Sequence, residues 1–372
     1  MSIPFFRVEV GGDEREKIDE VFDGEAPNII EDLESAFESY IGATYALSTS
    51  HGTSALHLAM LAIDLKRGDK VLCSINAYPS VPEVVRHFDA EPTFIDIYPD
   101  LFTIDLDKLE AYLHEHKSKK LKAVIVSHIA GQSIDLDRLY AIAKTYDVKI
   151  IEDAADALGA TYKGKKIGST GADITCFDFS PHLRRNVCNG GMMVSNDEDI
   201  IERAKSLRHH ALEIDDDSLG YVYDVTDIGS QYTISPLDAA VILIQLEKQD
   251  EIIERQQEIA AIFNERLADA PHITLPVVEQ DHSFSLYIVK IDKNRDSFAR
   301  ELKERGIETG LHYIPLHLLS YYKTKYSLRI NDFPVALRNY SQVLSIPNYA
   351  ALSDAEVEEI CDAILDVAAT RV

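Results

Sequence analysis

The stretch Ile150-Ile-Glu-Asp-Ala-Ala-Asp-Ala-Leu-Gly159 decides the fold. It begins as a short apolar strand that runs directly into Asp153, so a carboxylate stands at the end of a buried strand. In parallel sheets, ligands bind outside the carboxyl ends of the strands. A buried carboxylate there needs a cationic partner, and a protonated pyridinium nitrogen is one such partner. The stretch therefore predicts an α/β protein with a ligand site at this edge of its sheet.

Short apolar strands alternate with helices on both sides of this stretch. The pattern predicts helices at 31–41 and 53–63 and strands at 46–48, 70–73, 93–97, 123–127, 149–152 and 192–195. Such alternation is typical of βαβ units on a parallel sheet that is covered on both faces. We expect a large α/β domain, residues 1–245, built on a mostly parallel seven-stranded sheet.

The pattern changes to α+β near residue 245, where we place a second, smaller domain, residues 246–372. Long helices cover 238–253 and continue to 267, and a C-terminal helix covers 355–367. Between them the pattern predicts a strand at 285–291, a helix at 296–305 and a second strand at 309–313. The acidic run 213–218 is interpreted as a solvated loop.

The composition excludes several classes of protein. Sixty-three acidic residues against 37 basic ones leave a net charge of −26 over 372 residues, which argues against nucleic-acid partners and anionic membranes. The N-terminus has no signal-peptide pattern, and no apolar run reaches the roughly 18 residues that a membrane span needs. The four cysteines are isolated, which predicts reduced thiols, no metal site and a cytoplasmic protein.

Three further segments carry candidate chemistry. Gly52-Thr53-Ser54 opens an apolar helix after a strand, and free helix amides with a hydroxyl can hold a phosphate, although a simple N-cap fits equally well. Tyr78 follows a strand, where its ring could lie over a flat cofactor or simply pack. The segment Cys176–Asn196 is interpreted as a loop that crosses the sheet and enters a strand.

Together these segments resemble the DegT/DnrJ/EryC1/StrS family of sugar aminotransferases, which are pyridoxal-phosphate enzymes of fold type I. The resemblance covers essentially the whole chain, and it includes the segments 128–132, 227–240, 245–248, 312–317 and 333–354. It implies a cofactor, pyridoxal 5′-phosphate or pyridoxamine 5′-phosphate. It also implies a homodimer with shared active sites and a nucleotide-linked keto-sugar as the small-molecule substrate.

The resemblance also assigns roles to individual positions. Thr53 and Ser54 would hold the cofactor phosphate, Tyr78 would stack on the ring, and Asp153 would pair with the pyridine nitrogen. Further positions depart from the family pattern or lie on the sugar side. Asp156 stands where the family commonly has Gln or His, and Asp178 stands where it has Ser. Gln231 replaces an Asn and Thr233 an Arg. The positions that would contact the sugar are His312, Tyr313 and His317.

The Schiff-base lysine of the family is absent. The frame from Phe177 to Gly191 places Leu183 at that position, and a slip of one residue gives His182 or Arg184. No lysine occurs between Lys166 and Lys205. Without an ε-amine, the chain has neither a covalent link to the cofactor nor the usual proton carrier.

Three functions therefore stay open at this point. The first is a sugar aminotransferase-type protein of surface-polysaccharide or amino-sugar biosynthesis that has diverged at Leu183. The second is a lysine-free sugar dehydratase that depends on pyridoxamine or pyridoxal phosphate, in which a histidine, here His182, replaces the lysine. The third is a cofactor-independent or non-catalytic homologue that binds a sugar nucleotide.

Overall fold

The computed structural model describes residues 2–8, 10–180, 187–214 and 222–371. Its centre is a seven-stranded mixed sheet in the order β1-β9-β8-β5-β4-β2-β3, in which only β9 runs against the other strands. In that order the strands are β1 (Tyr45–Thr49), β9 (Gly191–Ser195), β8 (Ile174–Asp178), β5 (Lys149–Asp153), β4 (Leu121–Ser127), β2 (Lys70–Ser74) and β3 (Glu91–Ile95).

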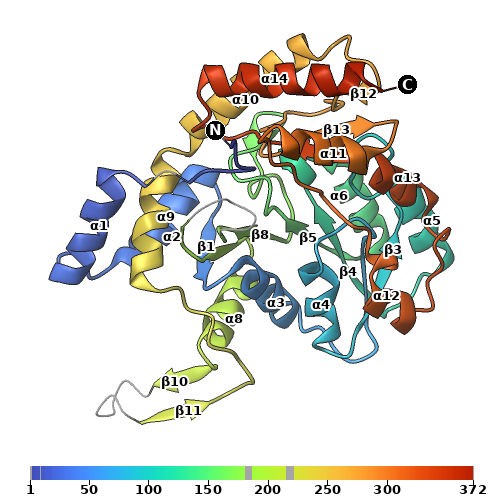
Figure 1. The fold of residues 1–372 in the computed structure, drawn as a ribbon. Coiled ribbons are helices and arrows are strands. Elements are labelled where there is room, and N and C mark those ends of the chain that lie inside the picture. Colours follow the sequence, from blue (N-terminus) through green and yellow to red (C-terminus); the bar gives the residue numbers. More distant parts are fainter. Residues whose placement is uncertain (1, 9, 181–186, 215–221, 372) are drawn as a thin grey trace.

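Helices cover both faces of this sheet, as Figure 1 shows. One apolar core joins the sheet to α2 (Ile29–Ile41), α5 (Leu106–Glu115), α6 (Leu136–Tyr146) and α9 (Pro236–Glu247). A second core lies on the other face, under α3 (Gly52–Ala62), α4 (Ser80–Arg86) and α8 (Glu198–Arg208). The first helix, α1 (Gly12–Asp23), packs beside α9. The seven-stranded sheet predicted from the sequence is confirmed.

The local sequence explains why these helices form where they do. In α2 the side chains of Ile29, Leu33, Phe37 and Ile41 recur every four residues, and all four are buried against the sheet. The helix ends at Gly42, whose φ of 79° lies in the left-handed region that favours glycine. Asp135 caps the N-terminus of α6, and its carboxylate accepts a hydrogen bond from the Arg138 amide.

The C-terminal part has its own apolar core and a three-stranded antiparallel sheet. The sheet consists of β12 (Ile273–Thr274), β13 (Tyr287–Ile291) and β14 (Val343–Ile346). The helices of this part are α10 (Gln249–Arg266), α11 (Arg295–Glu304), α12 (Ser320–Lys325), α13 (Pro334–Gln342) and α14 (Asp354–Ala369), with a short 3₁₀ turn at Leu316–Leu318. A second 3₁₀ turn, Ile129–Gly131, follows β4 in the large sheet. Ile3 joins this core and bridges to Ile307. A division at residue 245 stays a prediction.

Two expectations from the sequence are wrong. Residues 309–313 do not form a strand: Gly310 makes one isolated antiparallel bridge to Ser345 at the outer edge of β14, and the pairing does not continue to its neighbours. The segment interpreted as a loop begins inside β8, whose five buried residues pair with β5 on one side and β9 on the other. This strand is hard to predict from the sequence because it is short and is followed directly by polar residues.

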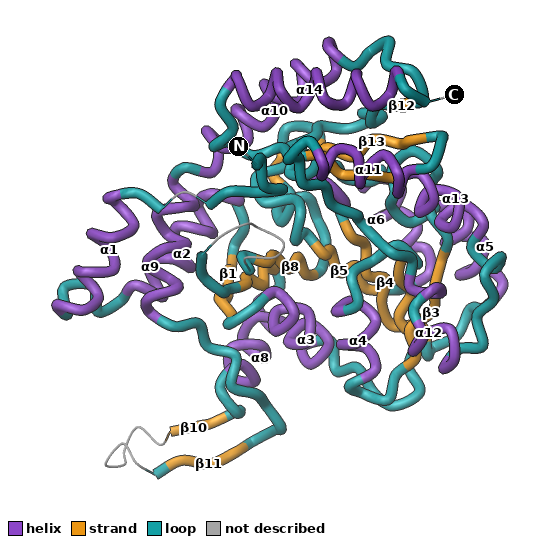
Figure 2. The backbone as a smooth tube through the Cα atoms, in the orientation of Figure 1, coloured by secondary structure: helices purple, strands orange, loops and turns teal. Residues whose placement is uncertain are grey.

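Two small hairpins complete the architecture. Strands β6 (Thr161–Tyr162) and β7 (Lys165–Lys166) form one of them. Strands β10 (Leu212–Ile214) and β11 (Tyr223–Val225) form an arm that extends away from the body of the protein in Figures 1 and 2. The expected acidic loop thus begins in a strand at Glu213, and residues 215–218 lie outside the described part. Among the described helices, none is long and apolar enough to cross a membrane.

Candidate active site

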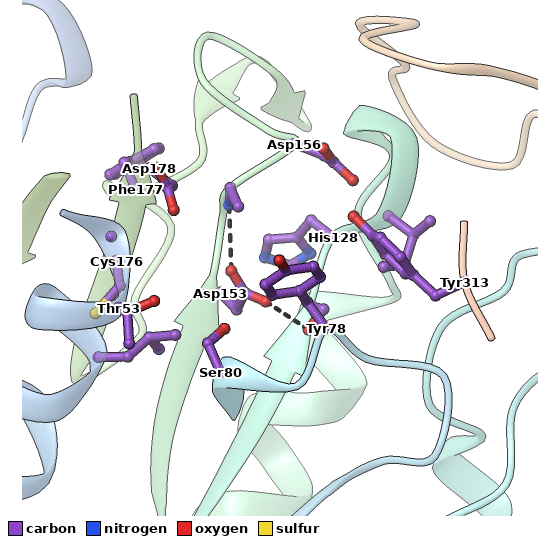
Figure 3. Close-up of a pocket in the computed structure, with 15 residues that line it drawn as sticks. Thr53, Tyr78, Ser80, His128, Asp153, Asp156, Cys176, Phe177, Asp178 and Tyr313 are labelled. Carbon is purple, nitrogen blue, oxygen red and sulfur yellow. Dashed lines mark hydrogen bonds between the residues drawn. The ribbon is translucent and has the colours of Figure 1, made fainter. Parts of the chain in front are cut away.

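A narrow pocket, partly open to solvent, lies at the carboxyl edge of the sheet. The ends of β4, β5 and β8 supply its floor, and the first turn of α3 and the loop before α4 supply its walls. Figure 3 shows the side chains that converge on this space. The predicted residues among the lining are Thr53, Tyr78, Asp153, Asp156, Asp178 and Tyr313. Residues up to 260 positions apart in the sequence thus meet in one pocket. The pocket lies at the end of the strand that contains Asp153, where the sequence predicts a ligand site.

Asp153 is the buried acid of this pocket. Its carboxylate accepts hydrogen bonds from the Ser127 hydroxyl at 2.8 Å and from the Ala155 amide at 3.3 Å. Burial, together with the nearby charges of Asp156 and Asp178, raises the pKa of Asp153 from 3.8 to about 6. A carboxylate held in this way favours a cationic group beside it, because such a partner removes the penalty of burying the charge.

Asp178 lies against the N-terminus of α3. A Cβ built on Gly52 would be 2.4 Å from the Asp178 Cβ and 2.6 Å from its Oδ2, so only glycine fits beneath this side chain. The other carboxylate oxygen accepts a hydrogen bond of 2.6 Å from the Ser180 amide. The N-cap residue of α3, His51, makes no capping hydrogen bond with its side chain. The positive end of the α3 dipole therefore faces a carboxylate that the chain itself provides.

Two tyrosines form the outer wall of the pocket. The ring of Tyr78 is 41% exposed and meets Tyr313 edge to face, with ring centroids 5.9 Å apart. The Tyr313 amide donates to the Asn76 side chain at 3.3 Å, which ties this C-terminal segment to the large sheet. An exposed aromatic ring above a buried carboxylate can cover a flat ligand that reaches Asp153.

Asp156 links the pocket to the C-terminal part of the chain. Its Oδ2 accepts a hydrogen bond of 3.3 Å from the Ala130 amide, which belongs to the 3₁₀ turn after β4. Its backbone carbonyl accepts a hydrogen bond of 2.6 Å from the Ser285 hydroxyl. Asp156 therefore fixes the shape of the pocket as well as lining it.

Other predicted site residues lie outside the pocket lining. Ser54 is buried, and its hydroxyl is 3.1 Å from that of Ser50. Gln231 is exposed and bonds to Thr233 and His209. His312 contacts Ser345 at 2.7 Å and stacks on Phe5.

His317 is fully buried beside Phe333, in the surroundings of a core residue. His182, Leu183 and Arg184 lie outside the described residues. The functional roles of all these positions stay predictions.

The sequence analysis gave no role to several residues that line the pocket. Ser127, His128 and Ser80 were missed, although each stands close to the end of a strand or the start of a helix. The available signal was position: Ser127 is paired with Asp153 in the parallel register of β4 and β5. That register becomes visible only once the two strands are known to be neighbours.

The comparisons with known proteins agree with this geometry. SpsC, a spore coat polysaccharide biosynthesis protein of Bacillus subtilis strain 168, is 31% identical over 351 residues, which are 91% of this chain and 89% of SpsC. DesV of S. venezuelae, solved in complex with a ketimine intermediate, is 28% identical with a TM-score of 0.88 over 96% of this chain and 95% of DesV. Spr1654 of Streptococcus pneumoniae in its PMP form is 25% identical with a TM-score of 0.89 over 99% of both chains.

The sheet, the acid at its edge and the helix N-terminus define a pyridoxal-phosphate transferase of fold type I. The match to the family description extends over residues 13–365. The chain belongs to the DegT/DnrJ/EryC1/StrS aminotransferase family. The cofactor of this family is pyridoxal 5′-phosphate or its aminated form, pyridoxamine 5′-phosphate (PMP).

Proposed function

We propose that the chain acts on a nucleotide-linked keto-sugar in surface-polysaccharide or amino-sugar biosynthesis, and that it uses pyridoxal 5′-phosphate or PMP without a covalent link. One observation carries the proposal: the pocket keeps Asp153, Tyr78 and Thr53 together, yet the described residues that line it include no lysine. The sequence agrees, since Leu183 stands at the family's lysine position. A chain of this kind holds its cofactor by hydrogen bonds, charge and stacking alone.

The pocket fits the ring of the cofactor well. Asp153 has the raised pKa of a buried acid that gains from a cationic neighbour, and a pyridinium nitrogen is such a neighbour. Tyr78 is exposed at the mouth of the pocket and can stack on the ring. When bound, the cofactor supplies a conjugated electron sink. The chain's own residues bind it, orient it and exclude water from one of its faces.

The phosphate position fits less well because of one residue. The first amides of α3 and the Thr53 hydroxyl are suited to an anion. Asp178 places a negative charge over the same helix end, against Gly52. We expect the cofactor to bind more weakly than it would with the serine that the family has at this position.

Membership of the family supports a proposal for the substrate and the assembly. SpsC is named for spore coat polysaccharide biosynthesis, which supports a sugar precursor of a surface polymer as the substrate. We propose a cytoplasmic homodimer in which the segment 227–240, with the exposed Gln231, reaches the pocket of the other subunit. The exposed apolar residues of the β10–β11 arm, such as Ile214 and Tyr223, support an interface there.

A second function has a specific observation in its favour. The carboxylate of Asp178 lies at the α3 N-terminus, where the cofactor phosphate would otherwise bind. A sugar-binding homologue without the cofactor would need such an anion in place of the phosphate. The dehydratase alternative rests on His182, which lies outside the described residues. Asp153 favours a cofactor-binding form over the cofactor-independent one, because a bound pyridinium would give its buried charge a cationic partner.

The test is a mass measurement after borohydride reduction in the presence of pyridoxal 5′-phosphate. We expect no covalent adduct on the wild-type chain, and one adduct at position 183 in the double variant Leu183→Lys, Asp178→Ser. The matched control is Leu183→Arg with Asp178→Ser, which adds a similar charge but no amine that can form a Schiff base. An adduct on the wild type would sink the proposal. Binding of a nucleoside-diphosphate keto-hexose, measured by calorimetry, checks the substrate class separately.

A further inference from the structure

His128 is the first residue after β4, and its side chain lines the pocket among Tyr78, Asp153 and Asp156 (Figure 3). It is 1% exposed. Histidine is the side chain most often used to take or give a proton near neutral pH. Among the residues that the structure describes, it is the only histidine of this pocket.

A buried carboxylate holds the far side of this ring. Glu152 is fully buried, and its Oε2 lies 3.6 Å from His128 Nε2. The Tyr140 hydroxyl donates to Glu152 at 2.6 Å, and the Thr175 hydroxyl donates to it at 3.0 Å. Burial alone would favour the neutral acid, but the contacts from His128, Tyr140 and Thr175 keep the pKa of Glu152 below its ordinary value. Glu152 is therefore a carboxylate, and its charge 3.6 Å from Nε2 favours the ring proton on that nitrogen.

Neither ring nitrogen of His128 has a hydrogen-bond partner in the described part of the chain, although both are buried. Nε2 has the Glu152 carboxylate 3.6 Å away, so Nδ1 is the nitrogen that is left available to a ligand. A buried polar atom without a partner is uncommon, and at a pocket it indicates a group that is completed by a ligand. With the proton on Nε2, Nδ1 is a bare acceptor. The arrangement is the acid–histidine pairing of a general base.

We propose that His128 Nδ1 is the proton acceptor of this pocket and that Glu152 is its positioning residue. The inference rests on the proposed function, since its substrate is a keto-sugar. The bond that breaks is a C–H bond next to the keto carbonyl, and its electron pair stays on the sugar as an enolate. The proton moves to Nδ1, and the imidazolium that results is balanced by Glu152. Return of a proton from Nδ1 to the same carbon restores the sugar with no net change in its atoms.

The experiment follows the exchange of this proton with solvent. A nucleoside-diphosphate keto-hexose is incubated with the protein in D₂O without cofactor, and deuterium at the carbons beside the carbonyl is measured by NMR and mass. We expect the wild type to accelerate this exchange. His128→Gln keeps a donor toward Glu152 but loses Nδ1, so it should slow exchange by about 10²- to 10⁴-fold. His57→Gln, which changes a partly buried histidine outside the pocket lining, should exchange as the wild type does.

Two further readouts separate the possible failures. Glu152→Gln should slow exchange by at least about tenfold while affinity for the sugar stays within about threefold, as expected for a residue that acts through the ring. Binding of the sugar by the wild type without exchange, or equal exchange by His128→Gln, would overturn the role of His128. Failure of the sugar to bind would instead count against the proposed function.

A measurement on the free protein keeps the inference testable without any ligand. ¹⁵N-edited NMR of the histidine rings should show His128 protonated at Nε2 and bare at Nδ1 at pH 8. In Glu152→Gln this preference should be lost. A His128 ring that carries its proton on Nδ1 in the wild type would contradict the proposed role whatever the sugar does.

Discussion

Removal of the charge of Asp178 should strengthen binding of the phosphate-bearing cofactor. Asp178 is buried, and its Oδ2 would lie 2.6 Å from a Cβ on Gly52, the first residue of α3. An anion held by the α3 amides would therefore share this helix end with a carboxylate. Two unit charges about 4 Å apart interact by about 4 kcal/mol at the effective dielectric of such sites. Partial solvent access to the pocket reduces this, so we expect a gain of about 2–4 kcal/mol, or roughly 30- to 1,000-fold in Kd.

Two variants divide this effect into charge and space. Asp178→Asn keeps the size of the side chain and an acceptor for the Ser180 amide, and so removes only the charge. Asp178→Ser also frees volume and adds a hydroxyl. Kd for pyridoxal 5′-phosphate is measured by equilibrium fluorescence, with pyridoxal, which lacks the phosphate, as the matched ligand. Asp269→Ser removes an equal charge at an exposed position far along the chain.

The reasoning requires a phosphate-specific gain. Both Asp178 variants should bind pyridoxal 5′-phosphate more tightly and leave the affinity for pyridoxal within about threefold of the wild type. Asp269→Ser should change neither affinity. An equal gain for both ligands would mean that Asp178 acts through the shape of the pocket, and no gain for either would refute a phosphate position at the α3 N-terminus.

Three other predictions concern stability, each measured by denaturant unfolding. Asp153→Asn should stabilise the ligand-free protein by about 3 kcal/mol above pH 6 and by nothing below pH 4. The reason is that the pKa of Asp153 is raised from 3.8 to about 6, so ionisation of Asp153 costs stability as the pH rises through that window. A gain that persists at low pH would contradict this. Ser353→Ala removes the capping box of α14 and should cost about 1 kcal/mol, whereas Ser341→Ala, at an exposed helical position, serves as its control. Phe177→Ala should cost about 3–5 kcal/mol, since this fully buried ring packs edge to face on Phe37; a loss below 1 kcal/mol would show that the core beneath β8 collapses around the gap.

The sequence predicted the parts of the site that carry local signals. Asp153 follows an apolar strand, and Gly52 to Ser54 open an apolar helix, so their placement at one edge of the sheet follows from the direction of parallel strands. The second strand expected at 309–313 failed for a non-local reason. The strand beside β13 is Val343–Ile346, some 30 residues further along and fully buried, and Gly310 meets only its outer edge in one bridge. Strand propensity alone cannot rank two such segments.

The partners of the site residues could not be predicted for a related reason. Ser127 meets Asp153 because β4 and β5 are neighbours in parallel register, with Ser127 opposite Asp153. His128 meets Glu152 through the same pairing. Neither contact has a signature in the sequence around it, because each depends on which strands are adjacent and on their exact alignment.

This register also explains how two groups in the pocket are held at once. Glu152 and Asp153 are successive residues of β5, so their side chains point to opposite faces of the sheet. The Ser127 hydroxyl of β4 fixes Asp153, and Glu152 of β5 lies against the His128 ring that follows β4. A residue of β4 thus positions Asp153 of β5, and a residue of β5 positions His128, which follows β4. A change in the alignment of β4 and β5 would therefore displace Asp153 and His128 together. On our proposal that Leu183 stands at the family's lysine position, the acid–histidine pair at the sheet edge is the group that moves a proton, and the alignment of β4 and β5 holds that pair in place.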